Sequence, residues 1–173
     1  MPIKGDYLGM SLSIDDLDVE NLAYFKHCAE HNFHLQQCND CKLLRYPPTT
    51  ACPWCMSGEA SWVPVEGKGA VHSYTEVHHA IQPAFREHVP YLILLVDLDT
   101  QKGKPSADEA LRVVGNLVTP DGKMAPPQLV RTVGIGTRVR MVFADVSPGL
   151  SVPQWTIDEA AAQPDKPWRY PQE

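Results

Sequence analysis

Apolar residues along this chain recur with two different periods. From residue 15 onward they return every three or four positions, which is the spacing of one face of an amphipathic α-helix. The residues on this face are Leu17, Leu22, Phe25, Ala29 and Phe33. Asp15 or Asp18 is placed to cap the helix, because a carboxylate accepts hydrogen bonds from the free N–H groups of the first turn. Residues 1–13 are expected to form a flexible lead.

In the second half of the chain the period is two, which is typical of β-strands with one face toward a core. Residues 91–98 instead form an apolar run, which predicts a central strand buried on both sides. Gly115 marks a bulge or bend in the next strand. Val139, Met141 and Phe143 are expected to point inward from the fourth strand. The five predicted strands cover residues 70–79, 91–98, 111–118, 137–143 and 151–157.

Five short strands separated by turn signals fit a small antiparallel barrel of the OB type, with an SH3-like barrel or a sandwich as alternatives. The sequence thus predicts a mainly β protein with an N-terminal helix. The predicted segments are a lead and helix over residues 1–33, a cysteine-rich ribbon over 34–63, the barrel over 64–157 and a Pro-rich tail over 158–173. This tail is expected to be disordered or to dock on a partner as a strap.

Four cysteines form the strongest motif: Cys38, Cys41, Cys52 and Cys55. Each C-x-x-C pair places two thiolates on one tight turn, and two such turns facing each other make a tetrahedral site. This predicts structural Zn²⁺, with iron in the same sulfur cage or a metal-free or oxidised form as alternatives. Lys42 and Met56 depart from the ideal pattern, because glycine often follows the second cysteine of such a turn.

Composition limits the classes of function and the cellular compartments that fit this sequence. Hydrophobic residues make up 43% of the chain and charged residues 21%, as in ordinary globular proteins. The net charge of −6 gives no basic footprint for nucleic acid. The apolar run at residues 91–96 is too short to span a bilayer, and the N-terminus carries no signal-peptide pattern. With paired C-x-x-C motifs, this predicts a cytoplasmic protein that binds metal, with disulfides as the weaker alternative.

No local signature of a catalytic site is present, so we expect no catalytic residue. Two other sets of residues are candidates for binding. Arg112, Arg138 and Arg140 would form a basic patch that meets the phosphates of a nucleotide-tailed acyl carrier or of nucleic acid, or else a solvated strand face. Exposed tryptophans tend to anchor partner proteins. The candidates for partner contact are Trp54, Trp155 and Trp168.

The order of these features resembles a known two-part family with a rubredoxin-like zinc ribbon and a C-terminal OB-fold, catalogued as domain of unknown function 35. The ribbon followed by the Gly-x-Gly-x-Val-x-Ser strand is its most specific part. The matching segments are residues 33–48, 52–55, 67–75, 90–91, 96–98, 115–117 and 136–139. The resemblance implies Cys38, Cys41, Cys52 and Cys55 as zinc ligands. It also implies a non-catalytic partner of thiolase-fold enzymes that act on acyl-CoA, in some cases with a MaoC-like hydratase.

These features together lead to one functional hypothesis. We expect an accessory subunit that binds a thiolase-like enzyme or aldolase as a hetero-oligomer, in lipid or steroid side-chain breakdown, with acyl-CoA as a candidate ligand. Single-stranded nucleic-acid binding is one alternative, because both zinc ribbons and OB-folds support it. An independent acyl-CoA hydrolase is the other.

Overall fold

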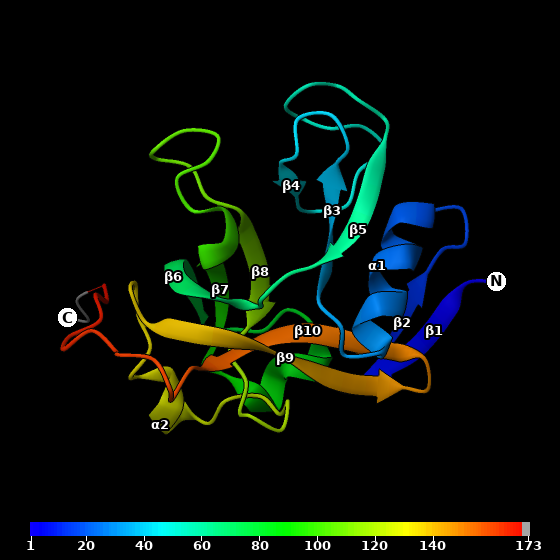
Figure 1. Ribbon diagram of the computed structural model, residues 1–173. Helices are drawn as coiled ribbons and strands as arrows, with labels where there is room; N and C mark the ends of the chain where they lie inside the picture. Colours follow the sequence, from blue (N-terminus) through cyan, green and yellow to red (C-terminus); the bar gives the residue numbers. More distant parts are fainter. Residues whose placement is uncertain (171–173) are drawn as a thin grey trace.

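A five-stranded antiparallel sheet forms the largest part of the molecule, whose computed structural model describes residues 1–170 (Figure 1). The strand order is β10-β9-β6-β7-β8. A parallel bridge between Leu117 and Trp155 links the end of β8 to β10 and closes the sheet into a barrel. This closed five-stranded arrangement is an OB-fold and confirms the predicted class. The strands are β6 (Lys68–Val77), β7 (Tyr91–Leu98), β8 (Arg112–Asn116), β9 (Arg138–Ser147) and β10 (Leu150–Ile157).

Burial along the strands follows the predicted alternation with one difference. In β7, four apolar side chains on one face are fully buried: Leu92, Leu94, Val96 and Leu98. Ile93 and Leu95 on the other face are half-buried, so the predicted burial on both sides is complete on one face and partial on the other. In β9, Val139 is buried, and Met141 and Phe143 pack against the core as predicted. The core therefore fills the barrel from one face of each strand.

Helix α1 (Val19–Ala29) packs against β10. The Asp18 carboxylate accepts a hydrogen bond from the Asn21 backbone N–H at 3.2 Å, so Asp18 is the N-cap and the predicted cap position is confirmed. Tyr24 and Cys28 face the core and are buried. Leu17 is 87% exposed, because the helix begins two residues after it. The apolar face predicted to include Leu17 is therefore shorter than expected.

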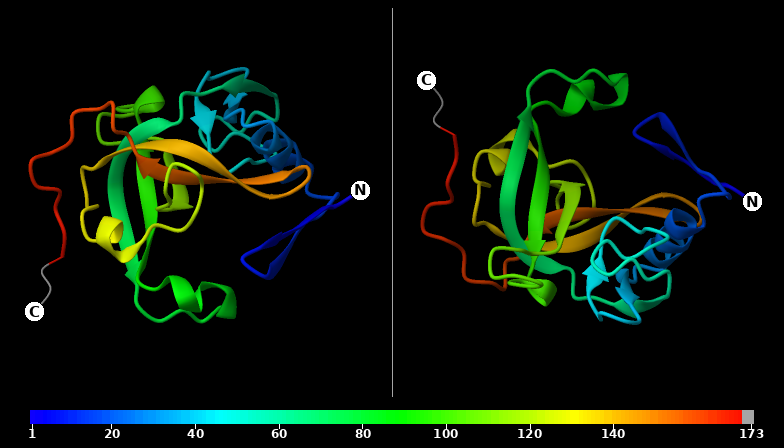
Figure 2. Two further views of the ribbon diagram at one scale, coloured as in Figure 1. Left: turned by 90° about the horizontal axis from the view of Figure 1, so that it is seen from below. Right: turned by 90° about the horizontal axis from the view of Figure 1, so that it is seen from above.

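The first fourteen residues form a β-hairpin, so the predicted flexible lead is wrong. Strand β1 (Ile3–Tyr7) pairs with β2 (Met10–Ile14) in antiparallel register. The turn residues Leu8 and Gly9 both have positive φ, at 55° and 81°. Such a two-residue turn matches the twist of the strands that it joins. The hairpin projects beside the barrel in both views of Figure 2.

The cysteine-rich ribbon is a three-stranded sheet in the order β4-β3-β5 and stands above the barrel in Figure 1. Its strands are β3 (His34–Cys38), β4 (Leu44–Arg45) and β5 (Ala60–Pro64). Phe33, Leu35 and Leu44 belong to the same hydrophobic core cluster as the barrel strands. Strand β5 ends at Pro64, one residue beyond the predicted end of the ribbon, and the division of the chain into separate domains stays a prediction.

Short connections complete the chain: η1 (Pro83–His88), η2 (Asp99–Gln101) and α2 (Pro127–Val130). Residues 158–170 lie on the barrel of their own chain, where Trp168 and Ile135 exchange two backbone hydrogen bonds of 2.9 and 3.1 Å. The Arg169 guanidinium binds the Val130 carbonyl at 2.8 Å and the Glu76 carboxylate. The predicted tail is thus a strap on its own barrel, and its residues 171–173 lie outside the described part. No helix within residues 1–170 is long and apolar enough to cross a bilayer.

Candidate functional site: a four-cysteine metal centre

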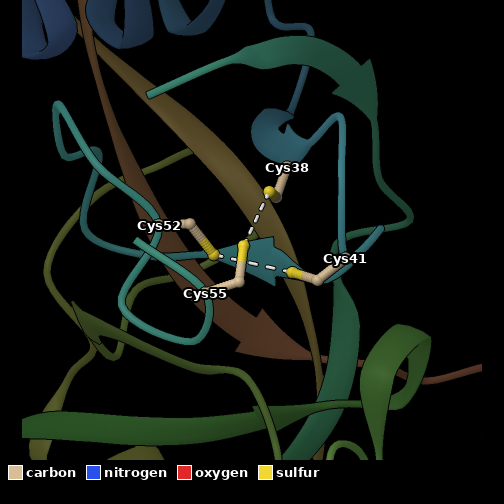
Figure 3. A group of neighbouring side chains, drawn as sticks. All are labelled: Cys38, Cys41, Cys52 and Cys55. Carbon is tan, nitrogen blue, oxygen red and sulfur yellow. Dashed lines mark hydrogen bonds between the residues drawn. The ribbon is translucent and has the colours of Figure 1, made fainter. Parts of the chain in front are cut away.

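Two tight turns bring four cysteine sulfurs together at the end of the ribbon (Figure 3). All four Sγ atoms lie within 4.8 Å of one another. The Cys38–Cys55 and Cys41–Cys52 sulfur pairs are 3.5 and 3.6 Å apart. A disulfide would need about 2 Å. Sulfurs around a tetrahedral metal with bonds of about 2.3 Å are about 3.8 Å apart, so these four residues fit a metal ion.

The backbone of each turn explains why Lys42 and Met56 are tolerated. Both residues adopt a left-handed conformation, with φ of 65° and 66°. Their N–H groups donate to the Cys38 and Cys52 carbonyls at 3.1 and 2.9 Å. This is the conformation that glycine adopts without strain at such positions. Lys42 and Met56 in place of glycine therefore raise the conformational free energy of each turn but do not change its geometry.

Backbone hydrogen bonds favour thiolates on the inner side of this site and outweigh the opposing effect of burial. Cys38 and Cys52 are fully buried, whereas Cys55 is exposed. The backbone N–H of Cys41 holds the pKa of the Cys38 thiol at about 6, well below the ordinary value of a cysteine. Four thiolates complete the coordination of a tetrahedral ion and leave no open position for substrate. The arrangement therefore suits a structural metal, and its sulfur ligands suit zinc or iron.

A buried arginine is hydrogen-bonded to the segment that precedes the second cysteine turn. The Arg45 side chain donates to Gln36 Oε1 at 2.9 Å and to the Thr49 carbonyl at 2.8 Å. Gln36 Oε1 also accepts the Thr49 backbone N–H at 2.8 Å. These bonds hold the segment that leads into Cys52. Neither Arg45 nor Gln36 was identified from the sequence, because nothing in its local pattern shows which side chains face each other across β3 and β4.

The structure separates the three predicted partner-binding tryptophans. Trp54 lies between Cys52 and Cys55 and is 45% exposed, and Trp168 on the strap is 55% exposed. Both side chains are available to a partner. Trp155 has no exposed surface and packs in the barrel core. The structure therefore contradicts a direct partner contact by Trp155.

The predicted arginine patch is largely neutralised by carboxylates from neighbouring strands. Arg138 binds Asp99 through both ends of its guanidinium and holds the pKa of that carboxyl below its usual range. The Nε atom of Arg112 lies 2.8 Å from Asp97 Oδ1. Arg140 makes no ion pair with any residue in the described part of the chain. Of the three, Arg140 is therefore the one left free to meet a phosphate.

Comparison with known proteins places this architecture in a family. Residues 62–144 match the family model described as the C-terminal OB-fold domain of ChsH2. A chain of the solved Ltp2–ChsH2(DUF35) aldolase is 30% identical, and its alignment covers 83% of this chain and 98% of that one with a TM-score of 0.64. This chain belongs to the ChsH2 (DUF35) family. A DUF35 protein of unknown function from Sulfolobus solfataricus is 14% identical, covers 79% of this chain and 83% of its own, and has a TM-score of 0.48.

A curated relative of this DUF35 chain is considerably longer. It is the probable enoyl-CoA hydratase alpha subunit of Thermomonospora curvata, which is 33% identical over 134 residues. The alignment covers 78% of this chain and 36% of that subunit. The DUF35 chain thus spans about a third of the length of the curated relative that it matches.

Proposed function

We propose that this chain is a non-catalytic accessory subunit of an acyl-CoA-using enzyme, and that its partner is a thiolase-fold enzyme or aldolase. One observation carries the proposal. The chain aligns with nearly the whole length of a chain in a solved assembly whose name joins a DUF35 protein to an aldolase. The motif-level resemblance to partners of thiolase-fold enzymes points the same way. The stable complex would be a hetero-oligomer.

The four-cysteine site has a supporting role in this proposal. We assign Cys38, Cys41, Cys52 and Cys55 as ligands of a structural Zn²⁺, with iron as the alternative occupant. The ion would fix the second cysteine turn, which carries both Trp54 and Met56 at the exposed end of the ribbon. An aromatic side chain held on a rigid turn loses little conformational freedom on binding, which favours its use as an anchor.

The partner would contact the ribbon tip and the strap, through Trp54 and Trp168. Both side chains are about half exposed although tryptophan is among the largest apolar residues. Arg140 is the candidate for contact with a phosphate of the acyl-CoA, because its guanidinium has no carboxylate partner among the described residues, unlike Arg112 and Arg138. The proposal thus assigns the two tryptophans to contact with the partner enzyme and Arg140 to contact with acyl-CoA.

Co-expression with a thiolase-fold enzyme from the same genome tests the proposal. The expected result is co-elution in size-exclusion chromatography and loss of enzyme activity when this chain is left out. Trp54→Ala or Trp168→Ala should weaken the complex at least tenfold. Ile81→Ala is the matched control, because Ile81 is also apolar and exposed but belongs to neither the ribbon nor the strap. A stable chain that neither co-elutes with nor activates any such enzyme would refute the proposal.

A second partner class has a specific observation in its favour, namely the hydratase name of the curated relative. In that case the chain would co-purify with a MaoC-like hydratase, alone or together with the thiolase-fold enzyme. Two further outcomes would replace the accessory role. Acyl-CoA turnover by the isolated chain would establish a hydrolase, and steep salt-dependent binding of single-stranded DNA or RNA would establish a nucleic-acid function.

A further inference from the structure

Strand β2 forms one edge of the N-terminal hairpin, and within residues 1–170 its strand partner is β1 alone. The hairpin extends from the body of the molecule in both views of Figure 2. Natural edge strands are usually protected by charged side chains, proline or a bulge. Residues Met10–Ile14 contain no charged residue and no proline, and their pairing with β1 runs without a register shift. This edge is therefore open to another strand.

The turn geometry fixes which backbone groups of β2 face outward. Tyr7 and Met10 flank a two-residue turn, and such residues form a hydrogen-bonded pair. Because antiparallel pairs alternate, Gly5–Leu12 and Ile3–Ile14 are hydrogen-bonded pairs as well. The N–H and C=O groups of Ser11 and Ser13 then point away from β1, toward the free edge.

The side chains of β2 divide into two sets. Met10, Leu12 and Ile14 lie on one face and are half-buried, whereas Ser11 and Ser13 lie on the other and are exposed. The sequence of apolar and polar residues is therefore symmetric about Leu12. An antiparallel strand of the same sequence, paired about Leu12, would place apolar side chains opposite apolar ones and serine opposite serine.

We propose that β2 pairs with β2 of a second copy of this chain, about a two-fold axis at Leu12. Ser11 of each copy then lies opposite Ser13 of the other, so the outward backbone groups of both strands exchange hydrogen bonds. Met10 faces Ile14 of the second copy, and the two Leu12 side chains meet on the axis. The result is a continuous four-stranded antiparallel sheet with a two-fold interface.

A second copy suits this edge because the apolar and polar positions of β2 are symmetric about Leu12, so the strand is complementary to itself. No charged side chain lies on β2, so two copies also bring no like charges into opposition across the new pair. Five paired residues bury far less than the roughly 1,200 Å² of a stable interface. The dimer is therefore weak and depends on concentration. This inference does not rest on the proposed accessory function.

Sedimentation velocity of the full metal-loaded chain, from roughly 10 μM to 1 mM, tests the proposal. The parent should change from one copy to two across this range. Ser11→Lys/Ser13→Lys and Ser11→Glu/Ser13→Glu should each weaken the dimer at least tenfold, because like charges then oppose across the axis. An equimolar mixture of the two variants should dimerise at least as well as the parent.

The two variants are matched within their own hairpin. Ser11 faces Asp6 and Ser13 faces Lys4 on β1, so each variant gains one attractive and one repulsive neighbour. Circular dichroism should show both folded. A parent that stays a single copy up to 1 mM would overturn the proposal, as would variants that dimerise like the parent or a mixture that does not recover. If the parent stays monomeric and the lysine variant no longer binds a thiolase-fold enzyme, the edge of β2 would be assigned to contact with that enzyme instead.

Discussion

At the residue scale, the cysteine turns carry a conformational cost that the sequence already indicated. Lys42 and Met56 adopt positive φ, which costs a residue with a Cβ atom about 1–2 kcal/mol. Glycine would remove this cost but lose more freedom on folding, by roughly 0.5–1 kcal/mol. The departure from the usual glycine was visible from the C-x-x-C spacing alone, since such spacing specifies the backbone of its own turn.

Met56→Gly should therefore raise the free energy of unfolding by roughly 0.5–1 kcal/mol. Met56→Ala is the control, because it removes the same side chain, which is 77% exposed, but keeps the Cβ atom and its strain. Urea unfolding of the metal-loaded proteins measures the difference. Equal stability of the glycine and alanine variants would show that the turn is not strained at this residue.

Residue type alone did not reveal which tryptophans are exposed. Trp54 was correctly predicted to be exposed, because the turn between Cys52 and Cys55 has little core to enter. Trp155 was misjudged because its side chain points into the barrel core beside Gly115 of a different strand, and a single sequence does not show that contact. Likewise, the pairing of Arg138 with Asp99 depends on which strands are neighbours, which a single sequence does not state.

At the element scale, closure of the barrel depends on a glycine. A Cβ atom on Gly115 would lie 2.9 Å from the Trp155 ring, which is closer than real contacts allow. Gly115→Ala should therefore destabilise the protein by about 1–3 kcal/mol through overpacking. Gly58→Ala is the matched control, since the nearest atom to its added Cβ is 3.9 Å away. Thermal unfolding should separate the two variants, and a Gly115→Ala protein as stable as the control would contradict this account of closure.

A single side chain connects the ribbon to the barrel by hydrogen bonds to the backbone. The buried Gln101 amide accepts from the Leu44 N–H at 2.7 Å and donates to the Leu44 carbonyl at 3.0 Å. Gln101→Ala leaves both buried groups without a partner, so it should cost about 2–4 kcal/mol of unfolding free energy. Gln37→Ala, which removes one exposed bond to Lys42, should cost less than about 0.5 kcal/mol. Similar losses in both variants would mean that this contact does not hold the ribbon in place.

Among the elements, those with a strong local pattern were predicted and those defined by distant contacts were not. The apolar run of β7 predicted its bounds, Tyr91–Leu98, without error. The hairpin of β1 and β2 was missed although Met10, Leu12 and Ile14 alternate, because five residues are few for a period to be recognised. The tail was predicted to be disordered or to dock on a partner, whereas it docks on the barrel of its own chain. Its anchor, Arg169, binds residues 36 to 93 positions away, and no local signal shows that.

At the scale of the whole molecule, the ribbon and the barrel share one core. Phe33, Leu35 and Leu44 pack in the same cluster as Leu92, Leu94 and Trp155. A change that unfolds the ribbon therefore exposes apolar surface of the barrel as well. The metal site and the OB-fold are expected to unfold together, in one cooperative transition.

Removal of the metal should therefore unfold more than the ribbon. Binding of a structural zinc contributes about 10–16 kcal/mol in zinc-finger peptides, which matches or exceeds the 5–15 kcal/mol by which a typical domain is stable. Cys38→Ser or Cys52→Ser should give an insoluble or unfolded chain. In calorimetry, a strong chelator should abolish the unfolding transition of the barrel together with that of the ribbon. Cys28→Ala, outside the four-cysteine site, should keep one metal per chain. A metal-free Cys38→Ser protein with parental stability would contradict this coupling, and a barrel that melts unchanged after chelation would show that the shared core is not cooperative.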